Sequence, residues 1–372
     1  MQIIADDAGL HALGATLARA SRIAVDVESN GMHAYRARVC TVQLAWEAQG
    51  GVACAVVDAL AVDVAALAPL LDHRGPEKVL HDLGFDARVL SDAGVHLGRA
   101  SDTEVMARLL GRPRTGLASL LAERGEAVSK ALQQHDWARR PLTPPQLEYL
   151  AGDVRHLFDL LDQLREEVAR AGIEPEVEEE TQHKLRGALR PEPPRPPHAR
   201  VKGLAAEDDV TRSVMHELLA ERERVAARLD LPPYKVANTE ALLLAARSRP
   251  RDAARLSSVS GMQRAARSPG GWLAAISRGV ARGAPPEEPP PPQPSQAERA
   301  SRSRREAALR AFRRAESQRR GVEEQVVLPG HCVEALSARA PETIEQLRAV
   351  DGLGSLRVAR YGERLLGLLS AG

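Results

Sequence analysis

The sequence contains few aromatic residues and few cysteines. Aromatic residues make up 3% of the 372 residues, so any core must be built mainly from Leu, Val, Ile and Ala. The three cysteines (Cys40, Cys54 and Cys332) are too few for a disulfide framework, and no Cys-x-x-Cys pair offers a zinc site. Cys40 and Cys54 lie in predicted strands, where we expect core thiols in a reducing compartment.

Long hydrophobic runs are also absent, and neither sign of charge predominates. No apolar stretch is long enough to cross a bilayer, and the N-terminus lacks the basic and then apolar pattern of a signal peptide. We therefore expect a cytoplasmic protein that does not bind membranes. Lys and Arg number 51 against 50 Asp and Glu, so the total charge indicates no ligand. The hydrophobic content of 44% and the chain length predict two or three folded domains.

Positive charge is concentrated in one segment. Residues 298–320 contain nine Arg against three Glu. This segment predicts either a surface that contacts phosphates or the solvated face of a helix, and charge alone does not distinguish the two.

Residues 1–172 have the pattern of an α/β domain. In the segment 22–28, Ile23, Val25 and Val27 alternate with Ala24, Asp26 and Glu28, which predicts a strand with both carboxylates on one face. Other segments predict a helix over 9–20, strands over 39–46, 52–57 and 78–81, a helix that begins near Asp86, and a capping box over 101–104. Strands followed by helices indicate a mixed sheet flanked by helices.

The last helix of this domain has the clearest signals. Thr143 is the predicted N-cap, Pro144 occupies the first turn, and Gln146 completes a capping box. Apolar residues continue at helical spacing from 147 to 164 and predict one helix that ends near 171–172. Tyr149 and Asp153 are four residues apart and therefore share a face of this helix.

The rest of the chain is predicted to form two small helical domains. Residues 173–203 are expected to be an extended linker, 204–282 a first helical domain, 283–297 a proline-rich linker and 298–372 a second helical domain. Both domains show the order helix, Leu-Pro, helix, Pro, helix, Val-x-Gly, helix, with a period of about 90 residues, so we interpret them as diverged copies.

Three separate segments each supply acidic residues that could meet in one site. These are Asp26 and Glu28 at the end of a strand, Asp86 near the start of a helix, and Asp153 within a helix. Four carboxylates in one pocket repel each other unless cations lie between them, and Mg²⁺ prefers such oxygen ligands. The pattern thus favours a two-metal site that hydrolyses phosphodiesters. The Tyr149 hydroxyl, one turn before Asp153, could orient the attacking water.

The order and spacing of these motifs resemble a known family. Asp26-x-Glu28, Asp86 and Tyr149-x-x-x-Asp153 resemble the three exonuclease motifs of the DEDD superfamily, tyrosine subclass. The stretch 136–143, Asp-Trp-Ala-Arg-Arg-Pro-Leu-Thr, is similar to ribonuclease D in particular, and His81 and Asp102-Thr103 fit as well. The two helical domains resemble HRDC domains, the nucleic-acid-binding modules of RecQ-type helicases and ribonuclease D.

The resemblance implies a ribonuclease H-like exonuclease domain followed by two HRDC domains. It implies a 3′-5′ exoribonuclease that releases nucleoside 5′-monophosphates and contributes to tRNA 3′ maturation. Asp26, Glu28, Asp86 and Asp153 would bind two divalent cations, Mg²⁺ or Mn²⁺, and Tyr149 would orient the water. The expected partner is RNA, with tRNA precursors as substrates and no obligate protein partner.

The sequence departs from the family pattern at one position and leaves alternatives open. Ser29 stands where relatives often carry a bulky residue that wedges against the terminal base, and His33 or Tyr35 could replace it. Asp82 is a fifth acid, for which we favour a turn or cap role over a metal role. An exonuclease acting on DNA ends and a non-catalytic RNA-binding scaffold are the alternative functions.

Overall fold

The computed structural model describes residues 1–126, 132–191, 196–286 and 294–370, which form two compact units. Unit 1 comprises Met1–Ser29, Val39–Arg190 and Pro292–Gly372, and unit 2 comprises Asn30–Arg38 and Pro191–Pro291. Among the helices in these described ranges, none combines the length and the apolar character needed to span a membrane.

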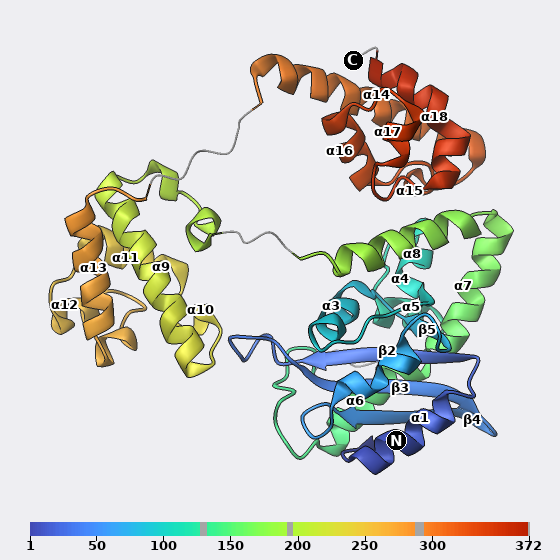
Figure 1. Cartoon of the computed structure of the whole chain (residues 1–372), viewed down its shortest axis with the longest axis horizontal. Coiled ribbons are helices and arrows are strands. Elements are labelled where there is room, and N and C mark those ends of the chain that lie inside the picture. Colours follow the sequence, from blue (N-terminus) through green and yellow to red (C-terminus); the bar gives the residue numbers. More distant parts are fainter. Residues whose placement is uncertain (127–131, 192–195, 287–293, 371–372) are drawn as a thin grey trace. The chain divides into compact units, whose positions relative to one another are not determined.

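The strands of the described residues form one sheet of six, which carries the N-terminal part of unit 1 (Figure 1). The strands are β1 Gln2–Ile4, β2 Arg22–Ser29, β3 Val39–Ala48, β4 Gly51–Asp58, β5 Glu77–Leu80 and β6 Ala100–Asp102, in the spatial order β1-β4-β3-β2-β5-β6. The pairs β2–β3 and β3–β4 are antiparallel, whereas β1–β4, β2–β5 and β5–β6 are parallel. The predicted mixed sheet is therefore confirmed.

Helices cover both faces of this sheet. They are α1 Asp7–Leu17, α2 Ala68–Leu71 after the 3₁₀ turn Val64–Leu67, α3 Gly84–Asp92, α4 Thr103–Leu109, α5 Leu117–Glu123, α6 Pro144–Arg155, α7 Leu157–Ala171 and α8 Glu174–Ala188. On β2, Ile23, Val25 and Val27 pack into one core together with α1 and α3. Ala24 belongs to a second core with α4, α5 and α7. Because side chains alternate along a strand, Asp26 and Glu28 project from the same side as Ala24.

Three local predictions need correction. The single helix predicted over 144–171 is two helices, because the chain turns at His156 while the apolar stripe continues into α7. The sequence carries no signal for this turn, because the apolar residues before and after His156 are buried alike and keep the same spacing. The predicted end at Gly172 is confirmed, with φ 62°. In the capping box over 101–104, the N-cap of α4 is Asp102, because Ser101 lies in β6.

The expected linker over 173–203 is also wrong in its first half, since residues 174–188 form α8. Its apolar residues Val177, Leu185 and Ala188 enter the cores of the sheet domain. Two of its acids are buried rather than solvated: Glu180 is 4% exposed, and Glu176 has no exposed surface and pairs with Arg320 and Arg360 at 2.9 and 2.6 Å. The acidic composition that suggested a linker instead provides partners for arginines far along the chain.

The C-terminal module of unit 1 is a bundle packed around its own core. Its helices are α14 Gln296–Arg320, α15 Glu324–Val327, α16 Gly330–Arg339, α17 Ile344–Arg348 and α18 Ser355–Ser370. Besides the Glu176 pairs, Glu179 of α8 binds Arg357 of α18 at 3.2 Å. Val326 of α15 joins the core beneath α4 and α7. Charged pairs and an apolar contact thus join this module to the sheet domain.

Unit 2 is a second helical bundle with a separate core. It contains the 3₁₀ turns Pro197–Arg200, Leu204–Ala206 and Ala265–Arg267 and the helices α9 Asp209–Leu229, α10 Pro233–Val236, α11 Thr239–Ser248, α12 Ala253–Ser258 and α13 Gly270–Arg282. Helices α9 and α13 pack against each other along this core (Figure 1).

The two helical bundles repeat at a constant interval of 91 residues. Arg249 and Ala340 (340 − 249 = 91) both have positive φ, 49° and 45°, and each is followed by Pro. Gly261 and Gly352 (352 − 261 = 91) also have positive φ. This interval does not align the two Leu-Pro pairs, which are 97 residues apart (328 − 231), so the Leu-Pro marker in the predicted repeat is wrong. A side chain on Gly352 would lie within 3 Å of two histidine rings, which accounts for a glycine at this position.

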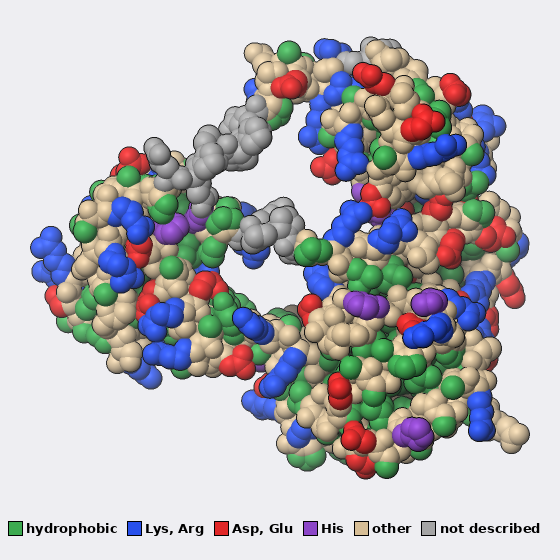
Figure 2. Space-filling model, in the orientation of Figure 1, with side chains coloured by type: hydrophobic (Ala, Val, Ile, Leu, Met, Phe, Trp, Pro, Cys, Tyr) green, Lys and Arg blue, Asp and Glu red, His purple; other side chains and the backbone are tan. Residues whose placement is uncertain are grey.

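The arginine-rich segment 298–320 lies in α14, and much of its charge is matched by glutamate. Six of its nine arginines form ion pairs in the described structure. Figure 2 shows Lys or Arg and Asp or Glu side chains interspersed on the visible face of the module that contains α14. Six of the nine arginines thus have a glutamate partner within the fold.

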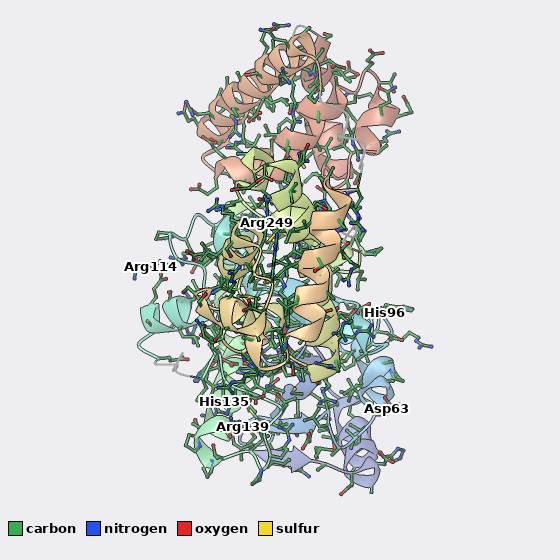
Figure 3. The ribbon with its side chains drawn as sticks, turned by 90° about the vertical axis from the view of Figure 1, so that its left-hand side faces the viewer. Asp63, His96, Arg114, His135, Arg139 and Arg249 are labelled. Atoms are coloured by element: carbon green, nitrogen blue, oxygen red, sulfur yellow. The ribbon has the colours of Figure 1, made fainter. Side chains whose placement is uncertain are left out.

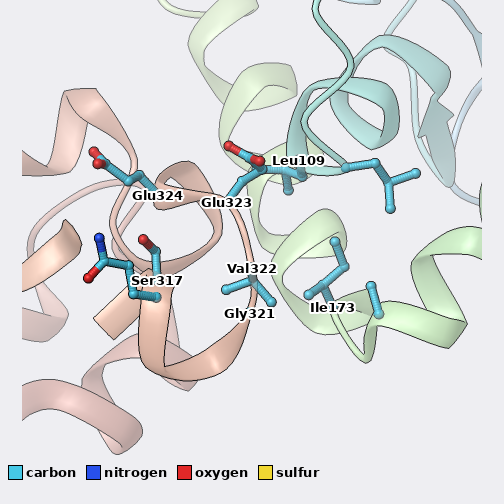
Figure 4. A pocket seen from close by; sticks show the side chains of 10 residues that line it. Leu109, Ile173, Ser317, Gly321, Val322, Glu323 and Glu324 are labelled. Carbon is cyan, nitrogen blue, oxygen red and sulfur yellow. The ribbon is translucent and has the colours of Figure 1, made fainter. Parts of the chain in front are cut away.

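A cavity of about 380 Å³ lies where this module meets the sheet domain (Figure 4). Leu109 and Ile173 line one side, and Gly321, Val322 and Glu324 line the other. None of the predicted site residues lines it. The cavity is therefore separate from the predicted acidic site.

Candidate active site

The fold brings together acidic residues from the strand β2 and the helix α6. Carboxylate oxygens of Asp26, Glu28 and Asp153 lie within 4.8 Å of one another, so the three could share a metal ion. Asp26 and Glu28 are two residues apart on β2 and therefore point to the same side, which α6 covers at this end of the strand. Residues 125 positions apart in sequence (153 − 28) thus meet at one site.

Asp86 lies close to this group but on a different element. It occupies the first turn of α3 and is 4% exposed. Burial raises its pKa well above the usual range, and the charges of Asp26 and Asp102 raise it further. Asp26 and Glu28 both raise the pKa of Asp86, so its charge interacts with theirs, although its oxygens are not among those that lie within 4.8 Å of one another.

The cluster resists ionisation in the absence of a cation. Burial raises the pKa of Asp26 to about 6. Burial, then repulsion by Asp26 and Asp153, raises the pKa of Glu28 to about 9. Burial and repulsion by Asp26 raise the pKa of Asp153 to about 8, against a hydrogen bond from Tyr149. Shifts of this size in adjacent carboxylates are typical of functional sites.

Tyr149 lies one turn before Asp153 on α6 and directs its hydroxyl toward the cluster. The hydroxyl donates a hydrogen bond to Asp153. Burial, followed by the charges of Asp153 and Glu28, raises the pKa of Tyr149 above its usual range. The hydroxyl therefore keeps its proton at neutral pH and can donate hydrogen bonds but cannot act as a base.

The segment before α6 holds Tyr149 in position. The Trp137 ring is 1% exposed, and its centroid lies 5.6 Å from that of Tyr149. Arg140 anchors the segment through two 2.7 Å bonds to the Asp58 carboxylate and a 2.8 Å bond to the Cys40 carbonyl oxygen. Figure 3 labels His135 and Arg139 on this segment. The His135 ring packs edge-on against the Trp137 ring, with 5.6 Å between the centroids, and so supports Trp137 from the side.

Two polar residues in β3 were missed by the sequence reasoning. Gln43 pairs with Asp26 and Thr41 pairs with Glu28 across the β2–β3 ladder, and both are fully buried. The Gln43 amide donates to the Thr41 hydroxyl at 3.0 Å. The pattern of a Thr and a Gln two residues apart in the otherwise apolar run 39–46 was the available signal, and it marks the strand beside the two carboxylates.

A second acidic cluster contains a lysine. Oxygens of Asp82, Asp102 and Glu104 lie within 4.8 Å of one another, and the Lys184 ammonium contacts all three at 2.8–2.9 Å. Asp82 has a φ of 63° in the turn before α3. Its position agrees with the turn role that we favoured. Lys184 belongs to the segment expected to be a linker, so sequence reasoning missed it.

The loop after Ser29 belongs to unit 2. The β2–β3 register shifts between Glu28 and Ser29, and the residues that follow leave the sheet. The Tyr35 ring packs against the unit 2 core, and its backbone N–H donates to Asp230 at 3.1 Å. His33 approaches Lys235 at 3.2 Å. Both candidate replacements for the missing wedge therefore already have contacts within unit 2.

A mixed sheet with clustered carboxylates on β2 and α6, a buried Asp86 on α3 and a tyrosine one turn before Asp153 is the arrangement expected of DEDD-type 3′-5′ exonucleases. Family comparison agrees, because residues 1–169 match the model described as 3′-5′ exonuclease. Residues 211–272 and 303–369 match the HRDC domain model.

Comparison with whole proteins identifies the family within this class. Ribonuclease D of Granulibacter bethesdensis is 31% identical over 312 residues, covering 79% of this chain and 75% of that protein. Ribonuclease D of Gluconacetobacter diazotrophicus is 31% identical over 262 residues, covering 67% and 63%. The chain belongs to the ribonuclease D family and is a metal-dependent 3′-5′ exoribonuclease.

Solved structures share the fold. Escherichia coli RNase D aligns with 100% of this chain and 98% of its own, with a TM-score of 0.72 and 22% identity. A protein from Bifidobacterium adolescentis aligns with 100% of this chain and 97% of its own, with a TM-score of 0.80 and 21% identity. Together with the family matches, this shared fold confirms the predicted architecture, an exonuclease domain with two HRDC domains.

Proposed function

We propose that Asp26, Glu28, Asp86 and Asp153 hold two divalent cations, Mg²⁺ or Mn²⁺, and that the enzyme trims tRNA precursors from their 3′ ends to nucleoside 5′-monophosphates. The observation that carries the metal assignment is the convergence of three carboxylates within 4.8 Å. The relatives named ribonuclease D support RNA as the substrate. The E. coli structure is described as that of an exoribonuclease involved in structured RNA processing, which supports a tRNA precursor.

The donor set fits hard divalent cations. All four side chains offer only oxygen ligands, which Mg²⁺ and Mn²⁺ prefer. Burial raises the pKa values of Asp26, Glu28 and Asp153, and repulsion by neighbouring carboxylates also raises those of Glu28 and Asp153. Positive charge between the carboxylates would offset both effects. The residues present therefore suit the proposed ions.

When bound, the cations would supply a water of lowered pKa and neutralise the charge that develops on the leaving oxygen. The protein's own contribution is to hold its carboxylates in place, and Tyr149 would orient the attacking water with its protonated hydroxyl. Trp137 fixes the ring of Tyr149 so that the hydroxyl stays beside Asp153. The HRDC domains would bind RNA mainly through its phosphates, which gives little sequence preference.

The metal assignment predicts that Asp153→Asn or Asp26→Asn lowers Mg²⁺-dependent trimming of a 3′-labelled RNA by more than ~100-fold, because even partners of metal ligands cost 10–100-fold. Asp159→Asn, an exposed Asp on the next helix, should retain the wild-type rate. Tyr149→Phe should lower turnover while calorimetry shows unchanged Mg²⁺ binding. Wild-type trimming by Asp153→Asn would refute the metal site, and loss of metal binding in Tyr149→Phe would refute the positioning role.

The substrate assignment needs a separate comparison. Trimming rates on a tRNA precursor with extra 3′ nucleotides and on a DNA strand of the same sequence should differ strongly in favour of RNA. Equal rates on both would favour the exonuclease that acts on DNA ends. Binding without cleavage of either strand would favour the scaffold.

A further inference from the structure

The side chain of Lys184 lies among three carboxylates, beside the turn that leads into α3. Its ammonium nitrogen is 2.8 Å from Asp102, 2.8 Å from Asp82 and 2.9 Å from Glu104. The lysine comes from α8, and the three acids come from the turn before α3 and from the start of α4. Three like charges this close need a cation, and Lys184 supplies it within the fold.

Asp102 connects this cluster to the backbone of two neighbouring segments. Its side chain is fully buried, and it caps α4 by accepting the Glu104 N–H at 2.9 Å. The same carboxylate accepts the backbone N–H groups of Asp82 and Leu83 at 2.9 and 3.1 Å. A single carboxylate therefore joins the start of α4 to the turn at 82–83, where Asp82 has a left-handed backbone.

That turn determines where α3 begins, and thus where Asp86 points. Helix α3 starts at Gly84, and Asp86 lies in its first turn. The apolar side of α8 supports the same region, because Leu185 and Ala188 share a core with Leu83 and Ala87. Lys184 and its apolar neighbours on α8 therefore contact the same short segment, the turn at 82–83 and the first turn of α3.

We propose that Lys184 is a positioning residue for the metal site, acting through Asp102 and the 82–83 turn on Asp86. The inference rests on the proposed function, since it takes Asp86 as a metal ligand. Lys184 lies beyond residue 169, where the match to the exonuclease family model ends. The catalytic unit thus extends into α8, the helix that also binds the C-terminal module through Glu176 and Glu179.

The loss of Lys184 would leave a buried Asp102 carboxylate beside two other acids. Repulsion among the three acids would weaken the two N–H bonds that hold the turn at 82–83. The first turn of α3 would then shift, and Asp86, which lies in that turn, would shift with it. Removing residues that orient metal ligands costs roughly 10–100-fold in metal affinity.

The test is Mn²⁺ binding to the full chain, measured by calorimetry and normalised to the folded fraction from circular dichroism in EDTA. Lys184→Met should weaken Mn²⁺ binding by roughly 10–100-fold. At saturating Mn²⁺, which would hold Asp86 in its ligand position, its kcat and its KM for RNA should stay near wild type, because Lys184 is not part of the cluster of Asp26, Glu28 and Asp153. Lys184→Arg should bind Mn²⁺ with intermediate affinity, because it keeps the charge but cannot place one nitrogen against three oxygens.

Arg186→Met is the matched control, since Arg186 lies on the same helix but faces Asp351 of the C-terminal module. It should bind Mn²⁺ like wild type. Wild-type affinity in folded Lys184→Met overturns the proposal, as does equal weakening in both variants. If Lys184→Met does not fold, Lys184→Arg decides, and wild-type affinity there also overturns it. Wild-type Mn²⁺ binding by Asp153→Asn would instead contradict the proposed function.

Discussion

At the scale of single residues, the site combines acids that would not tolerate one another without a cation. Asp26, Glu28 and Asp153 are adjacent; burial raises the pKa of each, and repulsion also raises the pKa values of Glu28 and Asp153. Tyr149 has a raised pKa for the same reasons, which keeps its proton on the oxygen. The carboxylates that would attract cations thus also keep Tyr149 protonated, so that it can donate a hydrogen bond but cannot act as a base.

These shifts predict how pH affects the stability of the metal-free protein. In the folded state the pKa is about 6 for Asp26, about 8 for Asp153 and about 9 for Glu28, against usual values of 3.8, 3.8 and 4.5. The folded protein therefore binds more protons than the unfolded chain. The stability therefore falls as pH rises from about 4 to about 9. The unfolding temperature in EDTA should drop from pH 5.5 to 8.5, and Mg²⁺ should reduce the drop.

Other groups also titrate over this range, so the informative quantity is a difference between variants. Asp153→Asn removes one of the three acids, and its unfolding temperature in EDTA should fall less than that of wild type. A fall as steep as that of wild type would show that repulsion at the site does not limit stability at high pH.

At the scale of elements, α6 and α8 contrast. The start of α6 follows from local signals, since Gln146 accepts hydrogen bonds from the Thr143 backbone N–H and hydroxyl at 2.8 Å. The role of α8 depends on distant partners. Glu176 pairs with Arg320, 144 residues away, and both its arginine partners lie in the C-terminal module.

The ion pairs of Glu176 are therefore expected to stabilise the contact between α8 and that module. Glu176→Ala would leave Arg320 and Arg360 without their buried partner, which costs about 3–5 kcal/mol. The free energy of unfolding in urea should fall by that amount. Glu178→Ala, an exposed position on the same helix, should change it by less than about 0.5 kcal/mol. Equal effects of the two variants would mean that the pairs do not fasten the module.

At the scale of the whole molecule, two units with separate cores should unfold separately. The acidic site lies in unit 1, so a cation bound there stabilises unit 1 by mass action and leaves unit 2 unaffected. Calorimetry should resolve two transitions, of which Mg²⁺ raises only one. In Asp153→Asn, Mg²⁺ should raise neither. A single transition that Mg²⁺ shifts as a whole would contradict independent unfolding.

The sequence by itself determined the features that depend on near neighbours. The alternation of Ile23, Val25 and Val27 predicted β2 and the shared face of Asp26 and Glu28, and the four-residue spacing placed Tyr149 beside Asp153. Periodicity and capping act over a few residues, so they leave a readable local pattern. The motif order was specific enough to indicate the family.

Only the tertiary structure decided which distant charges meet. Lys184 reaches Asp102 across 82 positions, and Glu176 reaches Arg320 across 144. A pair of this kind leaves no periodic signal, because each charge alone resembles an ordinary solvated side chain. The sequence of 174–188 therefore resembles a linker, although Lys184 contacts Asp102 and Glu176 contacts the C-terminal module.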